Sequence, residues 1–93
     1  MSAIYPWAAT GPGCDASGAC EKRDDALMTA AGYLQSGQAT TAEVEEAVVV
    51  SGRMRRGGRQ QYYHRTGQAW EAKVDDGHVT WVPVARAQEP AAP

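Results

Sequence analysis

The chain has 93 residues, of which 43% are hydrophobic, and a formal net charge of −2. This length allows one small domain with a single core, and the slight acidity excludes a surface that is basic all round. No apolar run approaches the roughly 20 residues of a membrane helix, and no charged region followed by an apolar stretch opens the chain. We therefore expect no membrane span and no secretory signal, and we place the protein in the cytoplasm.

The first 23 residues are rich in proline and glycine and show no sustained hydrophobic period. This composition predicts an irregular N-terminal arm. Its large side chains, Tyr5 and Trp7, are expected to anchor the arm to the core. The arm also contains Cys14 and Cys20. We interpret them as two free thiols in a reducing compartment, with a local disulfide as the second alternative. The histidines lie far away without motif spacing, so we expect no metal site.

Residues 24–36 are predicted to form the first helix. Asp24 or Asp25 can cap its start and suits the positive end of the helix dipole, and Gly37 marks its end. Gly32 inside the helix costs about 1 kcal/mol relative to alanine, which indicates close packing or an early end. Apolar residues recur at i, i+3, i+4 and i+7 on one face: Leu27, Ala30, Ala31 and Leu34.

Residues 40–50 are predicted to form a second helix, packed against the first because the connection is short. Thr40 and Glu43 match a capping box. In this motif the threonine hydroxyl accepts a hydrogen bond from the backbone N–H three residues later, and the Glu43 carboxylate accepts one from the N–H of Thr40. The apolar stripe of this helix is Val44, Ala47 and Val48, and its exposed glutamates are Glu43, Glu45 and Glu46.

The next segment is basic. Five of the seven arginines lie between residues 48 and 70, a stretch with no Asp or Glu. Glycines at 52, 57 and 58 favour a turn or loop over residues 51–58, with one helical turn over residues 53–56 as the alternative. Residues 59–66 fit either a short helix or a strand, because neither alternating face is clearly apolar.

The C-terminal part predicts a β-hairpin. Apolar residues alternate on both sides of the turn signal Asp75-Asp76-Gly77, as Trp70, Ala72 and Val74 and then as Val79, Trp81 and Pro83. Residues 85–93, rich in Ala, Gln, Glu and Pro, are predicted to form a disordered tail. The chain lacks phenylalanine and much of its apolar content is alanine, so we expect a modestly stable core that a homodimer would strengthen.

The order of helix, helix, basic segment and hairpin resembles a winged helix-turn-helix DNA-binding domain over residues 24–84. The run from Tyr33-Leu34 through Thr41-Ala42-Glu43-Val44 to Val50-Ser51 is similar to the family pattern. The resemblance implies an α+β fold of two or three short helices followed by a hairpin, after an irregular arm. It also implies that the segment after Ser51 enters the major groove and that the hairpin wing touches the DNA backbone. Lys73 and His78 would lie on or near the wing.

The residue types in the basic segment support the same function. Arginine binds phosphates and guanine edges through two hydrogen bonds, glutamine reads adenine, and tyrosine hydroxyls reach phosphates. The alternative is that the arginines pair with the chain's own carboxylates in a solvated network. The predicted nucleic-acid-binding residues are Ser51, Arg53, Arg55, Arg56, Arg59, Gln60, Gln61, Tyr62, Tyr63, Arg65 and Lys73.

We therefore expect a small non-catalytic protein that binds duplex DNA, as a transcriptional regulator or a mobile-element accessory factor. The alternative is a phage- or plasmid-encoded inhibitor that binds a host nucleic-acid-handling complex, as an anti-CRISPR does, through an acidic helix that mimics nucleic acid. No nucleophile lies at motif spacing from a histidine and Gly57-Gly58 lacks the phosphate-loop pattern, so we expect neither catalysis nor a cofactor.

Overall fold

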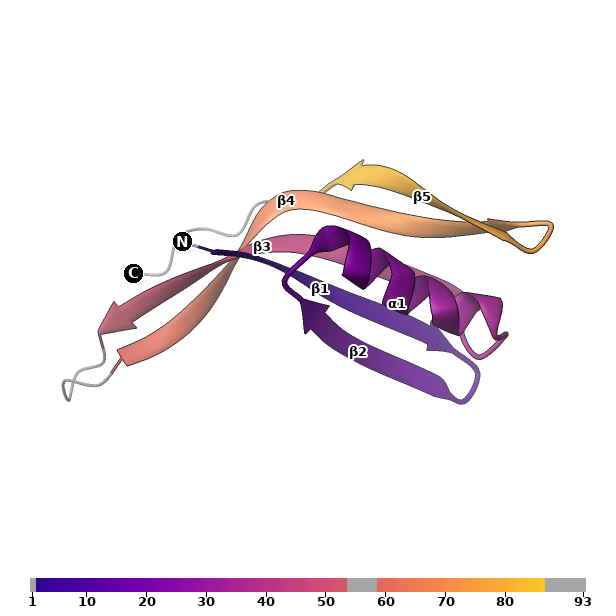
Figure 1. The fold of residues 1–93 in the computed structure, drawn as a ribbon, viewed down its shortest axis with the longest axis horizontal. Coiled ribbons are helices and arrows are strands. Elements are labelled where there is room, and N and C mark those ends of the chain that lie inside the picture. The colour runs from indigo at the N-terminus through magenta and orange to yellow at the C-terminus, as the bar shows by residue number, and fades with distance from the viewer. Residues whose placement is uncertain (1, 54–58, 87–93) are drawn as a thin grey trace.

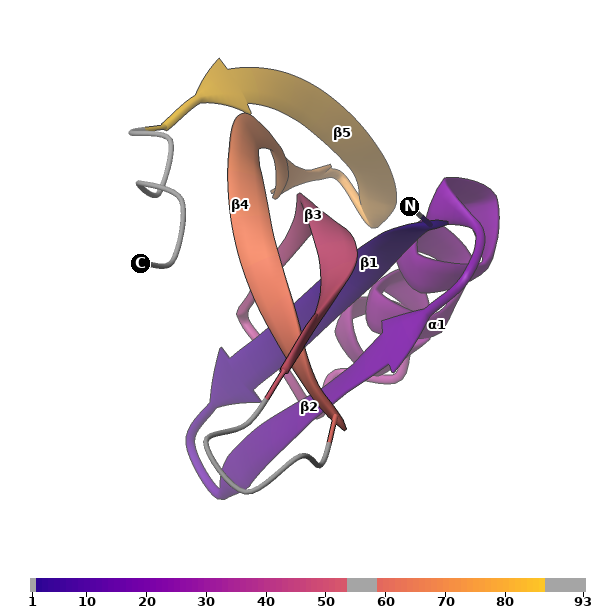
Figure 2. The ribbon, with the colours of Figure 1, turned by 90° about the vertical axis from the view of Figure 1, so that its left-hand side faces the viewer.

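The computed structural model describes residues 2–53 and 59–86, and of residues 2, 50–53 and 59–62 it describes the backbone alone. These residues form an antiparallel five-stranded sheet and one helix, and the sheet order is β2-β1-β3-β4-β5 (Figure 1). The helix α1 covers one face of the sheet, and among the described elements none covers the other face (Figure 2). The elements in chain order are β1 (Ser2–Gly11), β2 (Cys14–Cys20), α1 (Arg23–Gln35), β3 (Thr41–Arg53), β4 (Arg59–Asp75) and β5 (His78–Ala85).

The expected irregular arm is wrong, because β1 and β2 form a hairpin. Pro12 and Gly13 connect the strands, and Gly13 has a φ of 75°, which glycine adopts without strain. The expected anchoring is confirmed: Trp7 belongs to the buried core and Tyr5 packs against it. The ring of Trp7 lies 5.6 Å from the ring of Tyr33 in α1. Small residues and glycines hid this hairpin from the sequence pattern because they carry little strand propensity.

The first helix is confirmed over Arg23–Gln35. The predicted cap is wrong, because the helix begins after Lys22 without a side-chain cap, and both aspartates lie inside the first turn. Gly37 follows the helix with a φ of 78°, the left-handed conformation of a helix stop. A Cβ on Gly32 would meet nothing within 4 Å, so no close packing explains that glycine. Ala26, Ala30 and Leu34 are buried.

The predicted second helix is wrong, because its residues form β3, the central strand between β1 and β4. The expected architecture of two or three helices and a hairpin is therefore wrong as well. The glutamates placed on an exposed helix face lie on a strand instead. Thr41, Val44 and the valines at 48–50 favour extended backbone. The hydrogen bonds of two neighbouring strands outweigh one capping box, which is worth about 1 kcal/mol.

The strand β4 settles the open choice for residues 59–66, which are extended and pair with β3. The register shifts by two residues between the pairs Glu45↔Ala69 and Ala47↔Arg65. Gly67, with a φ of 92°, lies in the resulting bulge. A bulge of this kind bends a strand and increases its twist, so the two ends of β4 run in different directions.

The C-terminal hairpin is confirmed. Its strands pair from Gln68↔Ala85 to Asp75↔His78, and the turn uses positive φ at Asp76 and Gly77, 51° and 81°. The strand β5 ends at Ala85, so the first residue of the predicted tail belongs to this strand. Residues 87–93 of that tail lie outside the described residues.

The core is small and lies between α1 and the sheet. Val44, which faces the helix, is the largest fully buried side chain among those described. Alanine dominates the buried hydrophobic residues in the described ranges, so each contributes little buried area. In the described part of the chain, no helix has the length and apolar character needed to cross a membrane. The buried hydrophobic residues are Trp7, Ala9, Ala26, Ala30, Leu34, Ala39, Ala42, Val44, Ala47 and Ala69.

Candidate functional site

The most prominent feature of the fold is a two-stranded ribbon that extends from the sheet. Over the described residues, β1 pairs with β3 only as far as Ser2↔Val49. The pairing of β3 with β4 continues for four more residues, to Arg53↔Arg59. We call residues 50–53 and 59–62 the basic ribbon. Figure 1 shows that it points away from the helix and from β5.

Most of the predicted DNA-binding residues lie on this ribbon. Arg55 and Arg56 lie outside the described residues, between its two strands in the sequence. The register therefore brings arginine, glutamine and tyrosine positions close together, but on two strands and not on a recognition helix. The described pairs on the ribbon are Arg53↔Arg59, Gly52↔Gln60, Ser51↔Gln61 and Val50↔Tyr62.

Tyr63 and Arg65 lie at the base of the ribbon. Tyr63 is 57% exposed. The Nε atom of Arg65 lies 2.9 Å from a carboxylate oxygen of Glu45. The alternative that an arginine pairs with the chain's own carboxylates is thus observed at Arg65. Both side chains line a shallow groove of about 390 Å³ together with Pro6 and Ala47.

Lys73 lies far from the ribbon. It lies fourteen positions after Arg59 in β4, which corresponds to roughly 45 Å along the strand. Lys73 and His78 lie at the other end of the molecule, beside the β4–β5 turn. The structure therefore does not bring the predicted wing residues together with the arginine-rich segment.

An ionic cluster occupies the uncovered face of the sheet. Arg86 donates hydrogen bonds from Nη1 to Glu45 at 2.5 Å and from Nη2 to Glu43 at 2.7 Å and Glu71 at 3.2 Å. The hydrogen bond with Glu43, followed by that with Glu45, raises the pKa of Arg86 above its ordinary value. The cluster joins β3, β4 and the residue that follows β5. Sequence reasoning missed Arg86 because it lies in the predicted tail, and no local signal marked it.

Glu46 lies at the bulge and also has polar partners. Its carboxylate accepts a hydrogen bond from Thr66 Oγ1 at 2.9 Å and from the Tyr5 hydroxyl at 3.4 Å. Burial, and then the charge of Glu46, raises the pKa of Tyr5. The premise of an acidic helix that mimics nucleic acid is therefore wrong. Its three glutamates lie on β3 and bind side chains of this chain.

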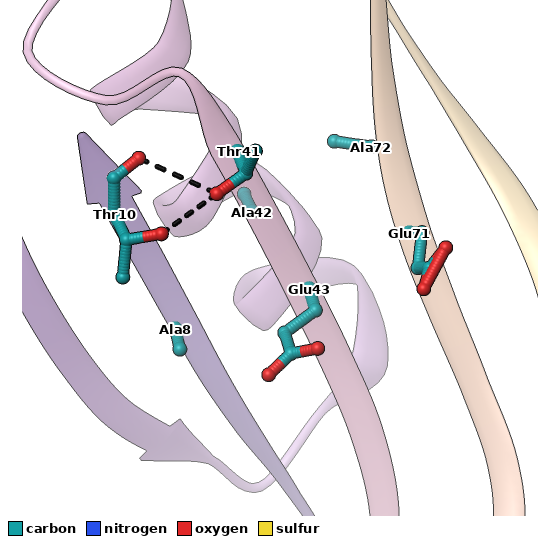
Figure 3. A pocket seen from close by; sticks show the side chains of 7 residues that line it. All are labelled: Ala8, Thr10, Thr41, Ala42, Glu43, Glu71 and Ala72. Carbon is teal, nitrogen blue, oxygen red and sulfur yellow. Dashed lines mark hydrogen bonds between the residues drawn. The ribbon is translucent and has the colours of Figure 1, made fainter. Parts of the chain in front are cut away.

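A second groove, of about 320 Å³, crosses the uncovered face beside the ionic cluster. Figure 3 shows Glu43 and Glu71 on two neighbouring strands and the hydroxyls of Thr10 and Thr41, 2.7 Å apart, at one end. Both carboxylates already bind Arg86. Among residues 2–53 and 59–86, no group of three His, Cys, Asp or Glu side chains is arranged to hold a metal ion. The groove therefore presents threonine hydroxyls and carboxylates that are already partly neutralised.

The charge of the chain is divided between residues 48–70, which include the basic ribbon, and the rest. Residues 48–70 contain five arginines and no acidic residue, a formal charge of +5. Because the whole chain carries −2, the remaining residues carry −2 − 5 = −7.

Comparison with known proteins gives no match to a family model, to a curated protein or to a solved structure.

Proposed function

We propose that this protein is a non-catalytic DNA-binding protein that inserts the basic ribbon into a groove of duplex DNA. Its role is that of a transcriptional regulator or a mobile-element accessory factor. The observation that carries the proposal is the register of β3 and β4. It places Arg53 opposite Arg59 at the described end of the ribbon, and two further arginines lie between them in the sequence.

The dimensions and residue types of the ribbon support this proposal. The major groove of B-DNA is about 12 Å wide and admits a two-stranded β-ribbon as well as a helix. The arginines supply contacts to phosphates and guanines, which set affinity and part of the specificity. Gln60, Gln61 and Tyr62 on β4 add adenine-reading amides and a phosphate-binding hydroxyl.

The charge division also supports an approach with the ribbon leading. The residues outside 48–70 carry −7, so phosphates repel them. The four described residues of β3 in the ribbon span roughly 13 Å. This distance exceeds the Debye length of about 8 Å at physiological ionic strength. Repulsion from the acidic body is therefore largely screened at the far end of the ribbon.

The test compares two double variants of equal charge change. Arg53→Ala/Arg59→Ala removes the opposed arginines, and Lys22→Ala/Lys73→Ala removes two exposed lysines outside the ribbon. Affinity is measured by fluorescence anisotropy with a labelled random duplex, after far-UV circular dichroism confirms that both variants fold. Two lost arginine contacts of about 1 kcal/mol each predict a weakening of at least tenfold for the arginine variant.

The lysine variant should bind within about twofold of the parent, because its charges lie elsewhere. Equal weakening of both variants would mean that net charge alone sets the affinity and would refute the ribbon as the site. Absence of binding by the parent protein at low salt would refute the function itself.

A further inference from the structure

The strand β2 is a free edge of the sheet, since it pairs with β1 alone among the described strands. In natural proteins, lysine, proline or a bulge usually protects an edge strand from pairing with a strand of another chain. The strand Cys14–Cys20 reads CDASGAC. It contains one charged residue, Asp15, and no proline or lysine, and its pairing with β1 is regular over all seven residues. Nothing in this strand prevents another strand from pairing with it.

The turn before β2 determines which backbone groups face the free edge. Pro12 and Gly13 connect Gly11 to its partner Cys14. In such a turn the fourth residue donates its N–H back across the hairpin. The backbone groups of Cys14, and by alternation those of Ala16, Gly18 and Cys20, therefore point toward β1. The alternate residues, at 15, 17 and 19, direct their N–H and C=O groups outward.

The two cysteines cannot pair with each other in one chain. They begin and end the same strand, six residues apart, which is roughly 20 Å. A disulfide requires Cα atoms within about 7 Å. Both thiols are free and half-buried, and both pack against the core on the helix-bearing face. A second chain is therefore needed to bring a cysteine to either of them.

We propose that β2 pairs with β2 of a second copy of this chain, antiparallel and centred on Ser17, so that Cys14 of each copy lies opposite Cys20 of the other. The outward groups of residues 15, 17 and 19 then form about six hydrogen bonds across the junction. Both cysteine pairs fall at non-hydrogen-bonded positions, where Cα atoms lie about 4.5 Å apart. That separation is within the range of a disulfide.

The remaining residues of the strand fit this register. Small residues oppose each other, with Ala16 against Gly18 of the other copy. Asp15 lies opposite Ala19, so the two carboxylates of the dimer are far apart. A parallel pairing in register would instead place Asp15 against itself, which is unfavourable for like charges. The helices stay outside the junction because α1 packs mainly on β1 and β3. The basic ribbons stay outside it because they belong to β3 and β4, and neither strand neighbours β2.

The paired cysteines make this dimer responsive to oxidation. The thiolate of Cys14 attacks a low-molecular-weight disulfide and releases one small thiol. The thiolate of Cys20 in the other copy then attacks the protein sulfur of the mixed disulfide and releases the second small thiol. Each intersubunit bond thus consumes one small disulfide and yields two small thiols. The non-covalent junction is short, so oxidation shifts the protein toward the dimer.

The test uses the full chain with oxidised glutathione, followed by non-reducing electrophoresis and intact-mass spectrometry. The parent protein should give a covalent dimer with two intersubunit disulfides that dithiothreitol reverses. Cys14→Ser alone and Cys20→Ser alone should give none, since each places a thiol opposite a serine. An equal mixture of the two variants, one of them labelled with nitrogen-15, should give a heterodimer with one disulfide.

Ser17→Pro supplies a control that retains both cysteines. Proline removes an N–H that points away from β1, so the fold should persist by circular dichroism while the cross-link is lost. If either single-cysteine variant cross-links with itself, the register is refuted. If the parent or the mixture fails to cross-link, or if Ser17→Pro cross-links fully, edge-to-edge pairing is refuted. None of these readouts involves DNA, so the dimer and the DNA-binding proposal can fail independently.

Discussion

Replacing Arg86 with methionine should destabilise the protein by about 2 kcal/mol. The substitution keeps most of the aliphatic volume but removes the guanidinium that binds Glu43, Glu45 and Glu71. The Arg86 side chain is 29% exposed and that of Glu45 is 17% exposed. Hydrogen bonds between charged groups contribute about 1.5–3 kcal/mol each. The ion pairs with the half-exposed Glu43 and Glu71 contribute only a few tenths of a kcal/mol each, because solvent screens them. Most of the lost stability therefore comes from the pair with Glu45.

Urea unfolding followed by tryptophan fluorescence measures this loss. With an m-value of about 1 kcal/mol/M for a chain of this size, the midpoint should fall by about 2 M. The control Lys73→Met removes an exposed cation on β4, and its urea midpoint should stay within about 0.5 M of the parent. In the parent, Glu43→Gln should be mildly destabilising. In the Arg86→Met background the same change should be neutral or stabilising, because Glu43 lies opposite Glu71 and no Arg86 then stands between the two carboxylates.

A midpoint that moves by less than about 0.5 M in Arg86→Met, or an effect of Glu43→Gln that is the same in both backgrounds, would show that the cluster does not hold the strands together.

Three other predictions concern the glycines at 11 and 32, Tyr5, and the opposed arginines of the basic ribbon. Gly32→Ala should raise the free energy of unfolding by about 0.5–1 kcal/mol, whereas Gly11→Ala should lower it because the new Cβ would lie 2.9 Å from backbone atoms of the loop before β3. Equal urea midpoints for the two variants would contradict this. Burial raises the pKa of Tyr5 above its ordinary value of 10.0, so the unfolded state ionises first and the stability that Tyr5 contributes below pH 10 is lost as the pH rises further. Tyr5→Phe should lose less stability than the parent between pH 8 and pH 11 by urea titration, and a loss equal to that of the parent would argue against this environment. Finally, the slope of log affinity for DNA against log salt should become less steep by about 2 in Arg53→Ala/Arg59→Ala, and an unchanged slope in anisotropy titrations would mean that these arginines do not contact phosphates.

Local signals predicted two parts of the fold correctly. The helix at 24–36 is marked by spacing of its apolar residues and by the glycine that follows it. The C-terminal hairpin is marked by alternation and by the turn at Asp76-Gly77. Both elements are built from contacts close in sequence, which a reading of short windows can detect. Their bounds differ from the prediction by only a few residues.

The central strand could not be predicted in this way. Val44 and Val48 lie at helical spacing, and Ala42 and Val44 lie at strand spacing, so the local pattern of this segment satisfies both periods. The choice is made by pairing with β1, more than thirty residues earlier, and with β4. A capping-box sequence cannot offset two ladders of backbone hydrogen bonds. The same non-local pairing changes the arginine-rich segment from an expected recognition helix into a ribbon.

The candidate site was predicted in composition but not in geometry. The absence of acids over residues 48–70 identified the segment, and the register then placed Arg53 beside Arg59. Arg65, at the base of the ribbon, pairs with Glu45. Neither the pairing of Arg65 nor the role of Arg86 has a local signature, since both depend on which strands become neighbours.

If the protein binds DNA as proposed, the basic ribbon is the surface that contacts the duplex. A titration of nitrogen-15-labelled protein with a short random duplex, followed by amide chemical shifts, tests this claim residue by residue. We predict that the largest shifts fall on residues 50–53 and 59–62, with little change in α1 or in the β4–β5 turn. Shifts concentrated on α1 or on the face that carries Glu43 and Glu71, with the ribbon unchanged, would contradict it.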